Sequence, residues 1–217
     1  MVASVPRRRR NEPERTASGS VVAFPVVEAD DATLVAGIVA EEPAALAALF
    51  ERYSPVVHRL LVRTLGTAGD VEDLAQETFL VVVRRCATLR DPTALRSFVV
   101  SVAIRLARNE LRKRTLRSWI GLGEAPHLEP ALPAHDAELA EGVRRIYAAL
   151  DRLGIEGRIA FVLRRVEGYE IHEAAEMCGC SQATFKRRLA RCEQQFEAIC
   201  ARDPLLKQYL DRREEDR

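Results

Sequence analysis

Aromatic residues make up only 6% of this 217-residue sequence, and no apolar run approaches the eighteen or so residues that a membrane-spanning helix needs. The stretch "VVAFPVVEA" is short and interrupted by Pro25, so we expect neither a signal peptide nor membrane insertion. We therefore expect a cytoplasmic protein whose five cysteines are reduced thiols. A formal net charge of +1 identifies no class of partner, which leaves the distribution of charge along the chain as the informative quantity.

Motifs that carry catalysis or bind metal ions are also lacking. There is no glycine-rich phosphate loop, and no strand–turn–helix pattern surrounds a candidate nucleophile. Cys178 and Cys180 are separated by one residue, whereas zinc sites commonly use two, and we expect both to be buried as small hydrophobic residues. We expect no enzyme activity, no cofactor and no metal, and the sequence leaves a redox role of a cysteine open.

Alanine, leucine, valine, arginine and glutamate dominate instead, which favours helices. We predict an all-α fold of two small helical domains that are joined by a flexible linker and move relative to one another. The segments are a disordered basic arm rich in Arg, Pro and Ser (1–28), a first domain (29–120), a linker with three prolines and two glycines (121–136), a helix-turn-helix domain (137–202) and a charged tail (203–217).

The first segment of interest, "DVEDLAQETFL" (70–80), holds four acidic residues and no basic one. Asp70 is expected to cap a helix that runs to about Cys86, with Leu74 and Val82 facing inward. The side chains left exposed on this helix are Glu72, Asp73, Gln76 and Glu77. They form either a solvated face near the positive end of the helix dipole or a docking surface for a basic helix of a partner protein.

The second segment, "SVAIRLARNELRKRTLR", belongs to an expected helix over residues 94–118. The side chains that fall on one side of it, at steps of four, three and four, are Ser101, Arg105, Arg108 and Arg112. Lys113 extends the positive charge, and Glu110 is the only acidic residue that offsets it. Such a stripe suits phosphate contact, because neutralised phosphates release counterions. A solvated helix face is the alternative.

The third segment is "RIAFVLRRVEGYEIHEAAEMCGCSQATFKRRLARCEQQF", in which a short helix, a turn at Gly179, a cap at Ser181 and a basic helix follow one another. This order is typical of a helix-turn-helix. With Phe185 and Leu189 inward, the positions expected to reach base edges are Gln182, Ala183, Lys186, Arg187 and Ala190. The positions expected to contact the DNA backbone are Thr184, Arg188 and Arg191. The alternative is an ordinary pair of packed helices.

In this order the segments resemble the extracytoplasmic-function (ECF) sigma factors of bacterial RNA polymerase, in the sigma-70 family. "LFERYSPVVHRLL" and "DVEDLAQETFLVVVRR" resemble the family's first conserved helices. "LRSFVVSVAIRLARNELRKR" resembles its helix that melts the promoter and reads the minus-ten element, and "EGYEIHEAAEMCGCSQATFKRRLAR" resembles its reader of the minus-thirty-five element. The resemblance covers about residues 44–199, and two motifs in the family's order are more specific than either alone.

The resemblance implies a sigma factor that binds core RNA polymerase and directs promoter-specific initiation, with a region 2-like first domain and a region 4-like second domain. Core polymerase and promoter DNA are the implied partners, and an anti-sigma factor is a family expectation. The residues implied to grip the clamp helices of the largest polymerase subunit are Glu72, Asp73, Gln76 and Glu77. The residues implied to melt or hold the minus-ten DNA are Phe98, Ser101, Arg105, Arg108, Asn109, Arg112 and Lys113.

Three of these positions depart from the family's usual residues. Phe98 stands where Trp is usual, Asn109 where Asp is common and Arg105 where Asn is common. We expect these departures to affect the preferred promoter sequence and not the role of the helix.

Two other functions remain compatible with the sequence. One is a free-standing helix-turn-helix transcriptional regulator with a helical effector domain, and the other is a protein–protein module that binds polymerase or an inhibitor without supporting initiation. Stoichiometric co-purification with core polymerase distinguishes a sigma factor from a conventional repressor.

Overall fold

The computed structural model describes residues 30–66, 69–120 and 137–208, and every regular element within these ranges is helical. The all-α prediction is therefore confirmed. The arm predicted over residues 1–28 and the linker predicted over residues 121–136 lie outside the described residues, as does most of the predicted C-terminal tail.

Over residues 30–66 and 69–120, the first domain contains four α-helices with two short 3₁₀ turns, Cys86–Thr88 (η1) and Pro92–Ala94 (η2). The α-helices are α1 (Asp31–Val39), α2 (Pro43–Leu65), α3 (Val71–Arg85) and α4 (Leu95–Trp119). Helix α2 begins with a proline, whose missing N–H costs nothing in the first turn, and it ends at Gly66, whose φ of 76° is the left-handed conformation that glycine adopts without strain.

The second domain holds the predicted helix-turn-helix. Its elements are α5 (Ala137–Asp151), α6 (Ile155–Phe161), the π-helical segment η3 (Val162–Val166), α7 (Ile171–Met177) and α8 (Gln182–Cys200). Gly179, with φ of 64°, turns the chain between α7 and α8. The predicted cap is confirmed, because the Ser181 hydroxyl accepts a hydrogen bond of 3.2 Å from the Thr184 N–H.

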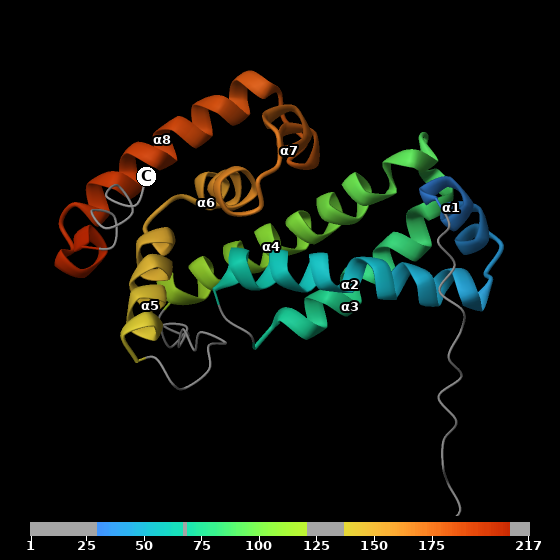
Figure 1. Ribbon diagram of the computed structural model, residues 1–217, viewed down its shortest axis with the longest axis horizontal. Coiled ribbons are helices and arrows are strands. Elements are labelled where there is room, and N and C mark those ends of the chain that lie inside the picture. Colours follow the sequence, from blue (N-terminus) through green and yellow to red (C-terminus); the bar gives the residue numbers. More distant parts are fainter. Residues whose placement is uncertain (1–29, 67–68, 121–136, 209–217) are drawn as a thin grey trace, which may run out of the picture.

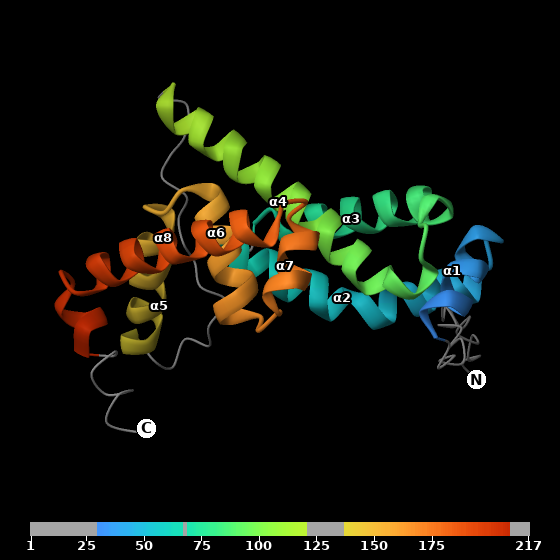
Figure 2. The ribbon, with the colours of Figure 1, turned by 90° about the horizontal axis from the view of Figure 1, so that it is seen from above.

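The two domains pack against each other along α4. In Figures 1 and 2, α4 lies between α2 and α3 on one side and α6 and α7 on the other. Val99 and Ile104 of α4 belong to the same buried apolar cluster as Leu163 and Phe185 of the second domain. The sequence predicts domains that move relative to one another, and the structure describes one arrangement of them, in which they share a core.

Candidate functional site

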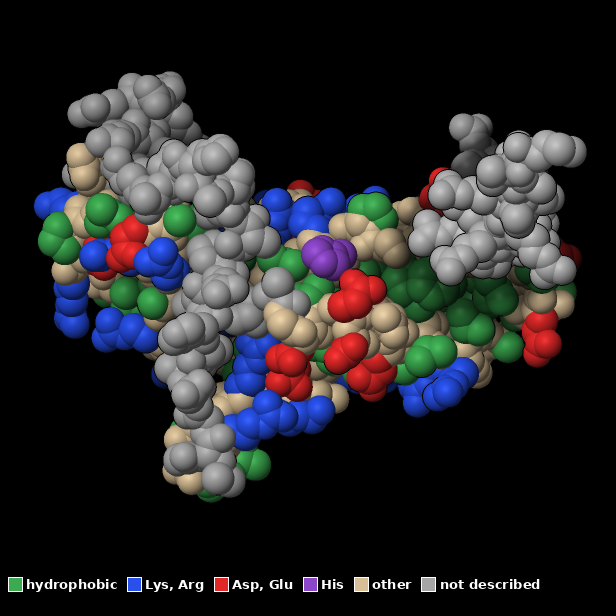
Figure 3. Space-filling model, turned by 90° about the horizontal axis from the view of Figure 1, so that it is seen from below, with side chains coloured by type: hydrophobic (Ala, Val, Ile, Leu, Met, Phe, Trp, Pro, Cys, Tyr) green, Lys and Arg blue, Asp and Glu red, His purple; other side chains and the backbone are tan. Residues whose placement is uncertain are grey.

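The exposed face of α3 carries the four polar residues that the sequence predicts there. We call this set the acidic ridge: Glu72, Asp73, Gln76 and Glu77, all exposed. The opposite face of α3 is buried and includes Leu74, Phe79 and Val82. At the end of the ridge the Leu80 side chain is 55% exposed, which adds apolar surface beside the charges. Figure 3 shows acidic side chains gathered on the side of the molecule that α2 and α3 form.

Asp70 precedes α3 as predicted, but its side chain makes no capping hydrogen bond. Its carboxylate instead lies 2.8 Å from Nη2 of Arg114 on α4. The same guanidinium donates a hydrogen bond of 3.1 Å from Nη1 to the Leu65 carbonyl at the end of α2. Asp70 therefore ties α3 to α4 and is not part of the acidic ridge.

The predicted basic stripe follows α4, but its members differ in exposure. The exposed members are Arg105, Asn109, Arg112 and Lys113, and the half-buried members are Phe98, Ser101 and Arg108. Phe98 and Ser101 line a cavity of about 200 Å³ together with Glu176 and Met177 from α7. The second domain therefore lies directly over the part of α4 that contains these two residues.

Glu110, the only acidic residue of the stripe segment, is buried with 6% of its surface exposed. Its carboxylate lies 3.5 Å from Arg114, 3.8 Å from Arg117 and 3.8 Å from Lys113. Glu110 therefore offsets charge mainly at the C-terminal end of α4, and it leaves the charge of Arg108 and Arg112 to another partner.

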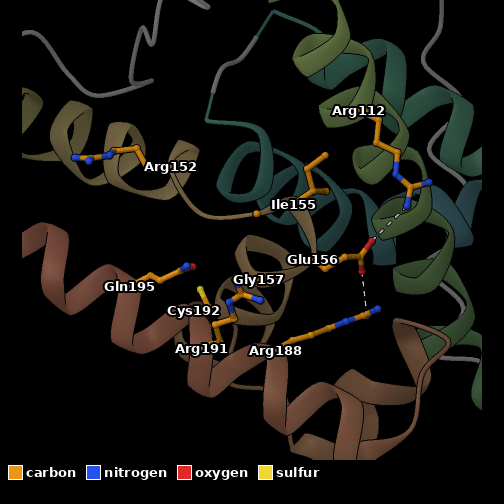
Figure 4. A pocket seen from close by; sticks show the side chains of 10 residues that line it. Arg112, Arg152, Ile155, Glu156, Gly157, Arg188, Arg191, Cys192 and Gln195 are labelled. Carbon is orange, nitrogen blue, oxygen red and sulfur yellow. Dashed lines mark hydrogen bonds and ion pairs between the residues drawn. The ribbon is translucent and has the colours of Figure 1, made fainter. Parts of the chain in front are cut away.

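That other partner, which the sequence reading missed, is Glu156 of α6. Its Oε1 lies 2.9 Å from Nε of Arg108 and 3.5 Å from Nη2 of Arg112, while its Oε2 accepts a hydrogen bond of 3.1 Å from Nη1 of Arg188 on α8. Figure 4 shows Glu156 between Arg112 and Arg188. No local spacing could have revealed this contact, because it joins residues from two domains that are more than forty positions apart.

Glu156 forms part of the wall of a cavity of about 510 Å³ between α4, α6 and α8. Four arginines line the same cavity: Arg112, Arg152, Arg188 and Arg191. The surroundings of this carboxylate are therefore strongly basic, and the cavity contains members of both predicted DNA-binding surfaces.

Helix α8, the second helix of the helix-turn-helix, exposes and buries its side chains as predicted. The exposed residues are Ser181, Gln182, Ala183, Lys186, Arg187 and Arg191, and the half-buried ones are Thr184 and Arg188. Phe185 is fully buried and Leu189 is buried, so they fix the orientation of the helix. The positions predicted to read bases are thus accessible, whereas Arg188 is engaged by Glu156.

The cysteines do not assemble into a recognisable site. Cys178 and Cys180 are half-buried, not fully buried as predicted, because they flank the exposed turn at Gly179. Burial raises the pKa of the Cys178 thiol to about 12 and that of Cys192 to about 11, which disfavours the reactive thiolate. Across residues 30–66, 69–120 and 137–208, no three His, Cys, Asp or Glu side chains are placed to hold a metal ion.

Within the described part of the chain, none of the helices combines the length and the apolar character that crossing a membrane requires.

Two family models match the chain in the order of its domains. The model of Sigma-70 region 2 matches residues 49–117, which include α3 and nearly all of α4. The model of Sigma-70, region 4 matches residues 143–195, which include the helix-turn-helix.

Characterised proteins similar to the chain are sigma factors. It is 33% identical over 168 residues to the ECF RNA polymerase sigma factor SigM of Mycobacterium tuberculosis, covering 76% of this chain and 81% of SigM. It is 30% identical over 145 residues to SigX of Bacillus subtilis, covering 64% and 74% of the two chains. It is 32% identical over 138 residues to the ferric citrate uptake sigma factor FecI of Escherichia coli, covering 60% and 76%.

The fold is also similar to solved structures. CnrH, in complex with the cytosolic domain of CnrY, has a TM-score of 0.59 at 20% identity, over 80% of this chain and 98% of that chain. The sigma factor RpoE of Bartonella quintana, in complex with the anti-sigma factor NepR, has a TM-score of 0.56 at 18% identity, over 71% and 95%. Because both sigma-70 regions match in order and SigM is similar over most of both chains, this chain belongs to the ECF sigma factors of the sigma-70 family.

Proposed function

We propose that the acidic ridge on α3 binds the clamp helices of the largest subunit of core RNA polymerase. As an ECF sigma factor the chain directs promoter recognition by the polymerase and is not itself an enzyme. The proposal is supported by the exposure of all four ridge residues and by the apolar Leu80 beside them. A ridge with three negative charges and one amide complements a basic helical partner, and charge complementarity of this kind favours rapid and specific association.

The basic stripe of α4 is proposed to melt and hold the minus-ten DNA. Arg105, Arg112 and Lys113 are exposed on this helix and are suited to phosphate contact. Phe98 and Ser101 line a cavity on the same helix, where an unstacked base could pack against the aromatic ring. Arg108 and Asn109 complete the proposed DNA-binding surface.

The exposed face of α8 is proposed to read the minus-thirty-five element in the major groove. Gln182, Lys186 and Arg187 offer donors for base edges near the start of the helix, where helix-turn-helix proteins contact DNA. Ser181, Ala183, Thr184, Arg188 and Arg191 are proposed to contact the DNA around them.

We further propose an anti-sigma factor as a partner, because the two solved structures named above are complexes, one with the anti-sigma factor NepR and one with CnrY. Since its polymerase partner acts on DNA, we place the chain in the cytoplasm. A free-standing regulator, the alternative function, would not explain why residues 49–117 match Sigma-70 region 2.

The single observation that carries the proposed function is the occurrence of both sigma regions in one chain with their charged faces exposed. The test is transcription in vitro with purified core polymerase and a genomic DNA library. We expect initiation at a limited set of promoters that share two elements. Failure of the purified chain to bind core polymerase at low salt would contradict the proposal.

A further inference from the structure

The C-terminal end of α4 carries three exposed apolar side chains, which we call the apolar tip: Leu116, Trp119 and Ile120. Trp119, the single tryptophan of the sequence, is 83% exposed, and Leu116 and Ile120 are 62% and 58% exposed. In Figure 2 this end of α4 extends beyond the other helices. Large apolar side chains are unfavourable in water, so a group of them on a projecting helix indicates a surface that another molecule covers.

The apolar tip lies on the same side of α4 as the basic stripe. Leu116 and Trp119 follow Arg112 at steps of four and three residues, which continue the spacing of the stripe from Ser101 to Arg112. With about 3.6 residues per turn, these steps keep the side chains on one side of a helix. Helix α4 is unbroken from Leu95 to Trp119, so the stripe and the tip form one surface that begins polar and basic and ends in an indole ring.

The charges around the apolar tip are mostly positive. Arg112, Lys113 and Arg117 are exposed in the last turns of α4. The Glu110 carboxylate lies 3.8 Å from Lys113 and 3.8 Å from Arg117, and Glu156 lies 3.5 Å from Arg112, so two carboxylates face three cations. A molecule that covers the tip therefore meets positive charge beside an aromatic ring. Nucleic acid matches both features, because its backbone is anionic and its bases have flat apolar faces.

We propose that Trp119 stacks on a base at the border of the melted promoter segment, with Leu116 and Ile120 on either side of this contact. The inference rests on the proposed role of α4 in holding the minus-ten DNA. A base at such a border has one face that no neighbouring base pair covers, and an aromatic ring replaces the missing stacking partner. The region 2 model ends at residue 117, so the match to the family does not account for Trp119.

Phe98 and Trp119 stand at opposite ends of this surface. Trp119 follows Phe98 by 21 positions, and a rise of about 1.5 Å per residue places them about 31 Å apart along the helix axis. At about 3.4 Å per nucleotide of one strand, this length corresponds to about nine nucleotides. A base held near Phe98 and a base stacked on Trp119 are therefore different bases, and Trp119 contacts a second position of the promoter.

The first experiment follows the emission of the indole ring itself. Because Trp119 is the single tryptophan, replacing tryptophan by 5-hydroxytryptophan in the full-length chain gives a signal that is excited selectively in the presence of polymerase. Holoenzyme with this sigma factor is mixed with a promoter from the genomic-library transcription, either fully paired or with a premelted segment. We expect iodide to quench the emission before DNA is added, and we expect the premelted promoter to quench it through contact between base and indole.

The second experiment identifies the base. An abasic substitution removes a base and keeps its phosphate, so it separates stacking from phosphate contact. Trp119→Ala should weaken binding of the holoenzyme to the premelted promoter about fivefold to a hundredfold, and Trp119→Phe should retain most of the affinity. One abasic position near the border should weaken wild-type binding similarly but leave Trp119→Ala unaffected, because the two changes remove the same contact. Val39→Ala, at an exposed position of α1, is the control and should bind normally.

The possible results lead to different conclusions. Equal sensitivity of the wild type and Trp119→Ala to every abasic position overturns the stacking contact. Protection of Trp119 from iodide in the holoenzyme before DNA is added overturns it as well, because polymerase then covers the apolar tip. A normal promoter complex in which Trp119 does not respond leaves the proposed role of α4 intact. If the wild-type holoenzyme forms no promoter complex, the proposed role of α4 has itself failed and this inference fails with it.

Discussion

Reversing two charges of the acidic ridge, Asp73→Lys with Glu77→Lys, should weaken binding to core RNA polymerase while leaving the fold intact. Both side chains are exposed on α3. One exposed ion pair is worth about 0.2–1 kcal/mol, and replacing attraction with repulsion roughly doubles the loss. Two positions then cost about 1–4 kcal/mol, which corresponds to a rise in Kd of about fivefold to several hundredfold.

The assay is equilibrium binding of fluorescently labelled sigma factor to purified core polymerase at several salt concentrations. Glu197→Lys is a control for one such charge reversal, because Glu197 is exposed on α8 and outside the ridge. The loss caused by the ridge variant should shrink as salt is raised, because salt screens exposed charges. Unchanged affinity at low salt, with thermal unfolding like that of the wild type, would refute the assignment of α3 as the docking surface.

Three further predictions concern the second domain. Replacing Lys186 and Arg187 by Ala should weaken the free energy of binding to the upstream element by about 1–3 kcal/mol for each true base contact. The loss should appear as reduced protection of this element in footprints of the holoenzyme. Retained selectivity would contradict the proposed role of α8. Phe185→Ala should lower the free energy of unfolding by about 3–5 kcal/mol, because the ring is 0% exposed; a loss below 1 kcal/mol in urea titration would show that the site repacks. Burial raises the pKa of Cys178 to about 12 and that of Cys192 to about 11, so alkylation of the two thiols at neutral pH should be slower than that of a free thiol by factors on the order of 10³ and 10². The alkylation rate should rise only as the pH approaches these values. Fast labelling at neutral pH would support a redox role.

Most of the helical fold follows from local pattern. The helix predicted from Asp70 to about Cys86 is α3 (Val71–Arg85), and the one predicted over residues 94–118 is α4 (Leu95–Trp119). These predictions succeed because apolar spacing, caps and glycines act within a few residues of each other. The exposure of the acidic ridge and of the α8 residues that are predicted to read bases follows from the same periodicity.

The contacts between domains could not be predicted in this way. Glu156 reads in the sequence as an ordinary acidic residue in the first turn of a short helix, and only the tertiary arrangement brings it to Arg108 and Arg112. Asp70 is a second example. The sequence pattern predicts its position before α3, but it does not predict that the carboxylate pairs with Arg114 and makes no capping hydrogen bond. Long-range pairing of charges leaves no periodic signal along the chain.

Helix α4 packs against the helices of both domains, and this packing makes the contact between the domains sensitive to temperature. Separation of the two domains would bring water to apolar surface around residues such as Val99 and Leu163 and would also break ion pairs. Wetting apolar surface raises the heat capacity, and the apolar attraction weakens on cooling, whereas dissolved salt weakens the ionic part. Cold and ionic strength therefore weaken different components of the contact between the two domains.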